Sequence, residues 1–72
     1  MQIWVSDTQT SSHRLVTLHC EAHSDYHYLG DLDTQQLQAY LLEIDPLIDI
    51  VKNQKLLNYY GYLHLLVPKK RV

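Results

Sequence analysis

One stretch decides the fold: Asp33-Thr34-Gln35-Gln36-Leu37-Gln38-Ala39-Tyr40-Leu41-Leu42-Glu43-Ile44-Asp45. Apolar side chains recur in it with the spacing of one helical face, at Leu37, Tyr40, Leu41 and Ile44. Side chains at i, i+3, i+4 and i+7 lie on one side of an α-helix, and the polar residues between them fall elsewhere. The stretch therefore predicts an amphipathic helix over 34–44 whose apolar face covers a core.

Signals for the start and the end of a helix bound this stretch. Asp33 can accept a hydrogen bond from the first turn, and Gln36 stands where a capping box requires a reciprocating side chain. Asp45 precedes Pro46, and a residue before proline is disfavoured in the helical conformation. We therefore expect the helix to begin after Asp33 and to end before Pro46.

Short runs rich in β-branched and aromatic residues predict β-strands on both sides of the helix. These runs cover residues 2–6, 14–20, 26–29 and 62–67. The polar stretch 7–12 predicts a loose hairpin connection between the first two strands, and Gly30-Asp31 is expected to close the third. Pro68 is expected to stop the last strand.

Alternation along the second strand predicts which of its faces is buried. Val16, Leu18 and Cys20 point to one side of a strand, and we expect this side to meet the core. The other side carries Leu15, Thr17 and His19.

The segment after the first helix fits two descriptions. In the one that we favour, a second helix starts at Pro46 and runs to Lys55 or beyond. In the other, 48–51 and 56–60 are strands joined by a polar turn. Gly61 interrupts either arrangement.

Together these elements predict an α+β fold. We expect a small antiparallel sheet of about four strands, with one or two helices packed on one face. The chain of 72 residues is expected to form a single globular domain over 1–68, followed by a basic C-terminal tail over 69–72. A domain of this size has a small core, so a homodimer or a partner-bound state is also expected.

Charge is distributed unevenly along the chain. Residues 1–50 hold all eight acidic groups and one basic group, Arg14, for a net charge of −7. Residues 51–72 hold five basic groups and no acid, for a net charge of +5. Either the two parts complement each other in the fold, or the second part offers a basic surface to an anionic partner.

The sequence favours a cytoplasmic location. Its N-terminus has no basic start followed by an apolar stretch, as a secretory signal would, and no run is long enough to span a membrane. The single cysteine, Cys20, cannot form an internal disulfide, which agrees with a reducing compartment.

Cys20, His23 and His27 have the C-x2-H-x3-H spacing of a loop that wraps a zinc ion. A structural zinc site needs a fourth ligand, which would come from a set of other side chains in the chain. The members of that set are His19, Asp25, His13 and His64. We favour the simpler interpretation, in which Cys20 packs as a small apolar group and the histidines lie half exposed on a loop, so that no cofactor is expected.

The sequence contains no pattern that indicates an enzyme. It has no glycine-rich phosphate loop, no nucleophile elbow and no pair of carboxylates in a catalytic context. His19 could activate the Cys20 thiol only from the same side of the strand, and neighbouring residues of a strand point to opposite sides. We therefore expect a protein without catalytic activity.

Two kinds of partner fit the sequence, a nucleic acid and another protein, and the nucleic acid is the alternative. Lys69, Lys70 and Arg71, with the tyrosines before them, form the combination of cations and aromatic rings that binds single-stranded nucleic acid. The acidity of residues 1–50 opposes this alternative, because it would repel phosphates.

The interpretation that we favour is a protein-interaction module. Six tyrosines and one tryptophan, with no phenylalanine, are the aromatic residues that interfaces prefer. If Tyr59 and Tyr60 lie on a strand, one of the two must be exposed. The chain is expected to act as an adaptor, inhibitor or assembly factor through an exposed tyrosine-rich surface or a sheet edge. The expected partner-binding residues are Tyr59, Tyr60, Tyr62, Lys69, Lys70 and Arg71.

Overall fold

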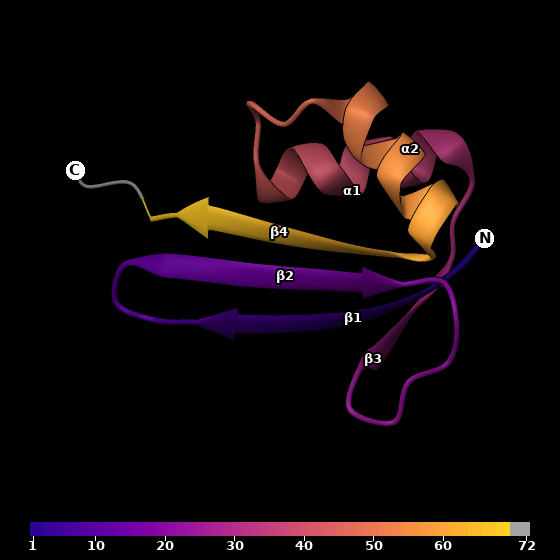
Figure 1. Ribbon diagram of the computed structural model, residues 1–72, viewed down its shortest axis with the longest axis horizontal. Helices are drawn as coiled ribbons and strands as arrows, with labels where there is room; N and C mark the ends of the chain where they lie inside the picture. The colour runs from indigo at the N-terminus through magenta and orange to yellow at the C-terminus, as the bar shows by residue number, and fades with distance from the viewer. Residues whose placement is uncertain (70–72) are drawn as a thin grey trace.

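The structure, a computed structural model, describes residues 1–69 and contains four strands and two helices (Figure 1). In chain order these elements are β1 (Gln2–Gln9), β2 (His13–His19), β3 (His27–Asp31), α1 (Thr34–Ile44), α2 (Ile50–Tyr60) and β4 (Tyr62–Pro68). The α+β class predicted from the sequence is confirmed.

All four strands belong to one antiparallel sheet with the order β3-β1-β2-β4. The β1–β2 hairpin forms the centre, and the strands that follow it in the sequence add to its two sides. β4, the last element, therefore pairs with β2 and lies beside it in Figure 1. Both edges of the sheet, β3 and β4, come from outside the hairpin.

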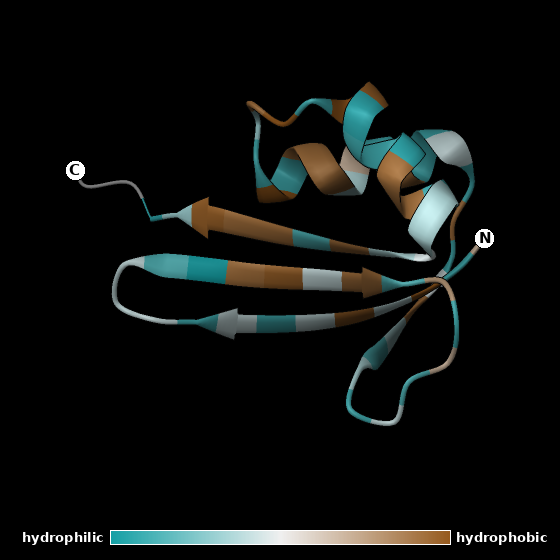
Figure 2. Cartoon of the chain, in the orientation of Figure 1, coloured by the Kyte–Doolittle hydropathy of each residue, from teal (hydrophilic) through white to brown (hydrophobic). Residues whose placement is uncertain are grey.

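Both helices pack on one face of this sheet, and the core lies between the two layers. The core side chains of the sheet alternate along β1, β2 and β4, as expected for strands with one covered face. Figure 2 shows hydrophobic segments on α1, β2 and β4. The buried apolar residues are Ile3, Val5, Val16, Leu18, Leu37, Leu41, Ile44, Leu57, Leu63 and Leu65.

The predicted first helix is confirmed at both ends. The Asp33 carboxylate accepts a hydrogen bond from the Gln36 backbone N–H at 2.8 Å, and the Gln36 side chain accepts one from the Asp33 N–H at 2.9 Å. Leu37 and Leu41 are buried on its inner face. The capping box and the apolar stripe therefore act together, because one sets where the helix starts and the other sets which side meets the sheet.

The second helix begins later than predicted. Asp45 binds the next residues in a turn instead, because its carboxylate accepts from the Leu47 N–H at 3.0 Å and its carbonyl accepts from the Ile48 N–H at 3.1 Å. Asp49 then caps α2, accepting from the Lys52 N–H at 3.0 Å. The competing prediction of strands over 48–51 and 56–60 is wrong.

Gly61 ends α2 and turns the chain into β4. Its φ is 77°, in the left-handed region that glycine adopts at no steric cost, and its N–H donates to the Leu57 carbonyl at 2.8 Å. The Gly61 carbonyl in turn accepts from the Cys20 N–H at 3.0 Å. The glycine thus joins the end of the helix to the end of β2.

The bounds of β1 and β3 differ most from the prediction, and those of β2 and β4 differ by one residue. β1 continues through Asp7 to Gln9, which were predicted as turn, because the pairing with β2 extends that far and Arg14 binds the Asp7 carboxylate across the pair. β3 starts at His27 and includes Gly30 and Asp31, which were predicted to close it.

Tyr26 precedes β3, so the predicted strand over 26–29 starts one residue too early. The register of β1 and β3 also shifts between Ile3 and Trp4, and Gly30 near the shift has a φ of 143°. An irregularity of this kind bends a strand, and glycine is the residue that tolerates the backbone angles involved.

Within residues 1–69, no helix is both long and apolar enough to cross a membrane.

Candidate functional site

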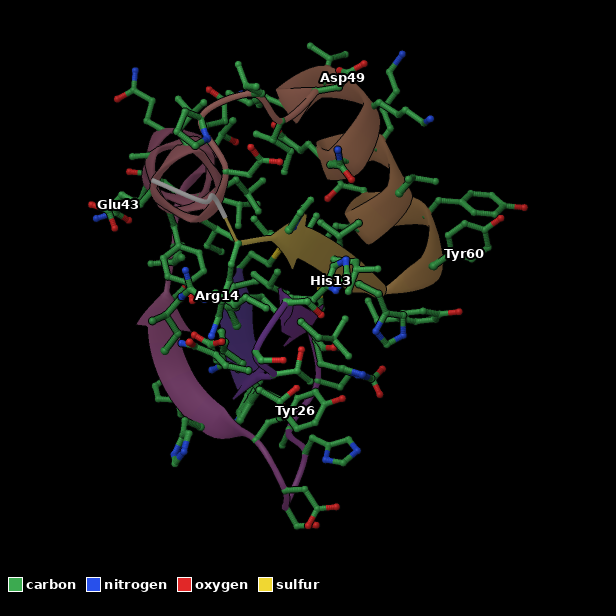
Figure 3. The ribbon with its side chains drawn as sticks, turned by 90° about the vertical axis from the view of Figure 1, so that its left-hand side faces the viewer. His13, Arg14, Tyr26, Glu43, Asp49 and Tyr60 are labelled. Atoms are coloured by element: carbon green, nitrogen blue, oxygen red, sulfur yellow. The ribbon has the colours of Figure 1, made fainter. Side chains whose placement is uncertain are left out.

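The face of the sheet opposite the helices, called here the open face, is the candidate functional surface. It consists of the strand side chains that alternate with the core residues. These side chains belong to Trp4, Ser6, Thr8, His13, Leu15, Thr17, His19, Tyr28, Tyr62, His64 and Leu66. In Figure 3, Arg14 lies toward the side of Glu43, and Tyr60 lies on the opposite side of the molecule.

An aromatic row crosses the open face from one edge of the sheet to the other. It consists of Tyr28, Trp4, His19 and Tyr62, one residue from each strand, placed opposite one another by the pairing register. The ring centroids of Trp4 and Tyr28 are 4.9 Å apart, and those of His19 and Tyr62 are 5.7 Å apart. Such distances are typical of aromatic pairs that stabilise one another.

The loop between β2 and β3 adds two more rings to this row. His23 and Tyr26 stack on each other with centroids 4.2 Å apart. Both also contact His19, at 5.3 Å and 4.9 Å respectively. The loop is therefore held against the open face through its aromatic side chains.

The end of α2 extends the aromatic surface beyond β4. Tyr60 lies 6.1 Å from Tyr62 between ring centroids, and Tyr59 lies 4.7 Å from Tyr60. Because this segment is helical, both are exposed, Tyr59 by 81% and Tyr60 by 58%. The three predicted partner-binding tyrosines therefore lie together, with Tyr62 in the row and Tyr59 and Tyr60 next to it.

Next to the row, the centre of the open face carries two polar side chains, Thr17 and His64, that hydrogen-bond to each other. The Thr17 hydroxyl lies 3.0 Å from Nδ1 of His64 and is buried although no helix covers it. The His64 ring also contacts Tyr62, at 5.2 Å between centroids. Further along, Leu15 and Leu66 pair across the strands and are both exposed.

None of the open-face side chains named above is an aspartate, glutamate, lysine or arginine, and Asp31, which pairs with Gln2 at the end of β3, is the one charged strand side chain on this side among the described residues. Asp7 and Arg14 lie on the helix side and bind each other, with 2.6 Å between Oδ2 and Nη2. The hydrogen bonds from Arg14 hold the pKa of Asp7 below its usual range. Asp31, at the end of β3, binds the N-terminal ammonium at 2.6 Å.

Two acidic residues of the β2–β3 loop border the aromatic row. Glu21 is close enough to His19 for its charge to oppose the lowering of that pKa. Asp25 lines a groove of about 400 Å³ together with Tyr28 and Tyr40. The groove continues along β1 past Val5, the last β1 residue that pairs with β3.

His19 is the most perturbed histidine of this surface. Its pKa is lowered, first by burial and then by the neighbouring His23 and His64, which would carry like charges. Protonation of this ring would place a charge within a cluster of aromatic side chains. The imidazole is therefore held neutral at pH values near 7.

The three predicted metal ligands do not form a group. The Cys20 thiol lies 3.6 Å from the Met1 sulfur and packs against the core, and burial raises the pKa of this thiol. His23 stacks on Tyr26, and its Nδ1 accepts from the Asp25 N–H at 3.2 Å. In the part of the chain that the structure describes, no three histidine, cysteine or acidic side chains are placed to hold a metal ion.

The predicted basic residues are not part of the aromatic surface as far as the structure describes them. Lys69 lies at the opposite end of β4, where its N–H donates to the Ser12 carbonyl of the β1–β2 turn at 2.9 Å. Lys70 and Arg71 lie outside the described residues.

Sequence patterns alone do not identify Trp4, His19, Tyr26 and Tyr28 as surface residues of one site. The alternation within each strand places Trp4 opposite Ile3 and Val5, and His19 opposite Leu18, but the assembly of the row needs the strand order. No protein-family model, curated protein or solved structure matches this chain. The candidate site is therefore interpreted from its own chemistry.

Proposed function

We propose that this chain is a non-catalytic protein-interaction module that binds its partner through the open face. The observation that carries the proposal is the aromatic row on a surface where, among the described strand residues, the one charged side chain is Asp31 at the end of β3. The cores of protein interfaces are enriched in tyrosine and tryptophan and depleted of charged residues, and the open face has this composition. The exposed Leu15 and Leu66 add apolar area beside the row.

Nucleic-acid binding is the weaker alternative for the same rings. Bases can stack on aromatic residues of a sheet, but affinity for nucleic acid comes mainly from cations that contact phosphates. The open face offers no lysine or arginine, and Glu21 and Asp25 border the row. The charge distribution therefore favours a protein partner.

The proposed role is that of a cytoplasmic adaptor, inhibitor or assembly factor. Its partner is another protein or a second copy of the chain, and no cofactor takes part. The area of an open face about four strands wide is small compared with the roughly 800 Å² that each partner buries in a standard interface. The tyrosines at the end of α2 would extend the contact.

Site-specific photocrosslinking tests this proposal. Benzoylphenylalanine replaces Tyr28 or Leu66 on the open face, and Leu42 on the outer side of α1 serves as the matched control. In cells that express the chain, we expect one discrete protein adduct from the two open-face positions and none from the control. An adduct of twice the chain mass would identify a second copy as the partner.

A reconstituted complex completes the test. The protein identified in the adduct is purified and titrated with the wild-type chain, with Tyr28→Ala and with Leu42→Ala. We expect about a 10-fold or greater loss of affinity for Tyr28→Ala, as for an aromatic residue in an interface core, and no loss for Leu42→Ala. The proposal is wrong if the open-face positions give no adduct, or if both positions and the control give the same adducts.

A further inference from the structure

We infer that the partner places a basic segment on the aromatic row, with arginine or lysine side chains over the rings and next to Glu21 and Asp25. This inference rests on the proposed function and specifies its partner. It follows from the accessible ring faces, from the position of the two acids and from the position of the cations that the structure describes.

The rings at the two ends of the row are accessible to a ligand. Tyr28 is 54% exposed and Tyr62 is 42% exposed, while Trp4 and His19 between them are half-buried. A cation within about 6 Å of a tryptophan or tyrosine ring is attracted by the negative face of the ring, and arginine makes this contact most often. The row therefore offers adjacent rings to neighbouring cationic side chains.

Glu21 and Asp25 supply negative charge beside these rings. The ion pairs among residues 1–69 are those of Asp7 with Arg14 and of the N-terminus with Asp31, so neither loop acid pairs with a described residue. Both lie on the loop whose His23 and Tyr26 rings pack on His19. Glu21 therefore lies near His19 and Asp25 near Tyr28, where a basic segment on the row would meet them.

The cations of the described chain lie elsewhere. Arg14 is on the helix side and binds Asp7, and Lys69 is at the far end of β4. Lys52 and Lys55 lie on α2, and Lys55 is one turn before Tyr59 on the same side of the helix. The described cations therefore lie away from the rings between the β2–β3 loop and Tyr62, and charge complementarity with Glu21 and Asp25 favours a basic segment there.

The experiment uses three peptides of ten residues that contain only glycine, serine and one variable residue at four positions. The variable residue is arginine, its uncharged isostere citrulline, or glutamate. Trp4 is the only tryptophan of the chain, so its fluorescence reports contact with the row. Titrations are made at pH 8, where His19 is neutral because burial lowers its pKa.

We expect the arginine peptide to change Trp4 fluorescence with saturation, and to bind more weakly as sodium chloride is raised from about 50 to 500 mM. We expect the citrulline peptide to bind at least about 10-fold more weakly, and the glutamate peptide to give no response. Per arginine, contact with an exposed ring corresponds to a factor of about 2 to 5 in affinity.

Matched variants connect the binding to the loop acids. Glu21→Gln and Asp25→Asn should each weaken the arginine peptide by a factor of about 2 to 5, as expected for one exposed charge pair. Glu43→Gln, which removes an acid on the other side of the molecule, should leave the affinity unchanged (Figure 3). Thermal melting of each variant checks that the fold is retained.

Equal binding of the arginine and citrulline peptides, or an equal effect of all three acid variants, would overturn the inference. So would the absence of a response to any of the peptides. The photocrosslinking of the open face is independent of these peptides. A discrete adduct with no preference for basic peptides would therefore leave the proposed function standing and remove only the inference about the partner.

Discussion

Leu41 and Leu42 are neighbours in α1 with opposite environments. Leu41 is fully buried in the core, whereas Leu42 is 40% exposed. Leu41→Ala should lower the free energy of unfolding by about 2–5 kcal/mol, because it removes apolar contacts and leaves a cavity. Leu42→Ala should lower it by about 0.5 kcal/mol or less. Urea unfolding of both variants measures the difference, and similar losses would contradict the placement of the helix.

His19 gives the fold a dependence on pH. Its pKa is lowered in the folded state, so below about pH 6.5 the unfolded chain binds more protons than the folded one. Stability therefore falls as the pH drops through this range, until the folded His19 is also protonated. We expect His19→Gln to reduce the loss of melting temperature between pH 7.5 and 5.

The control for this prediction is His13→Gln, at the exposed start of β2. It removes a histidine whose ring is not part of the aromatic cluster, so its effect on the pH profile should be smaller. If both variants show the wild-type profile, then the burial of His19 does not affect the stability of the fold.

Gly61 limits α2 through its backbone alone. Its φ of 77° is strained for any residue with a Cβ, while no atom lies within 4 Å of the place that a Cβ would occupy. Gly61→Ala should therefore cost about 1–2 kcal/mol without a steric clash. Gly61→Asn should cost less, because asparagine tolerates this conformation better. Equal unfolding midpoints for wild type and Gly61→Ala would refute this account.

The elements differ in how well their sequences predict them. In α1 the capping box, the apolar stripe and the following proline all indicate the same limits, and the prediction is correct. The start of α2 offers two caps, Asp45 and Asp49. Asp45 instead accepts a hydrogen bond from Leu47 in the turn that follows it, and Asp49 caps the helix.

At the scale of the whole molecule, the distribution of charge bears on nucleic-acid binding. We expect no retardation of a single-stranded oligonucleotide at about 100 mM salt, because the aromatic row is bordered by acids. Electrophoretic mobility shifts with oligo-dT and oligo-U measure this. Retardation that disappears when Lys69, Lys70 and Arg71 are changed to alanine would instead favour the nucleic-acid alternative.

The candidate site could be predicted only in part, because its residues come from several elements that are brought together by the fold. The tyrosine-rich segment 59–62 is local in the sequence, so its exposure could be expected. The aromatic row takes one residue from each of four strands, and its members become neighbours only through the order β3-β1-β2-β4. No spacing along the chain encodes that order. The row also depends on the pairing register, because a slip of one residue would turn the ring on that strand to the other face.

The order of the strands also determines how the protein must form during its synthesis. The ribosome makes the two central strands first, whereas β4, which pairs with β2, is made last. Until then the apolar side chains Val16 and Leu18 lack Leu57 and Leu63, their companions in the core. A β1–β2 hairpin that forms before α2 and β4 are available would therefore expose part of its apolar side, and the core is complete only when β4 has paired with β2.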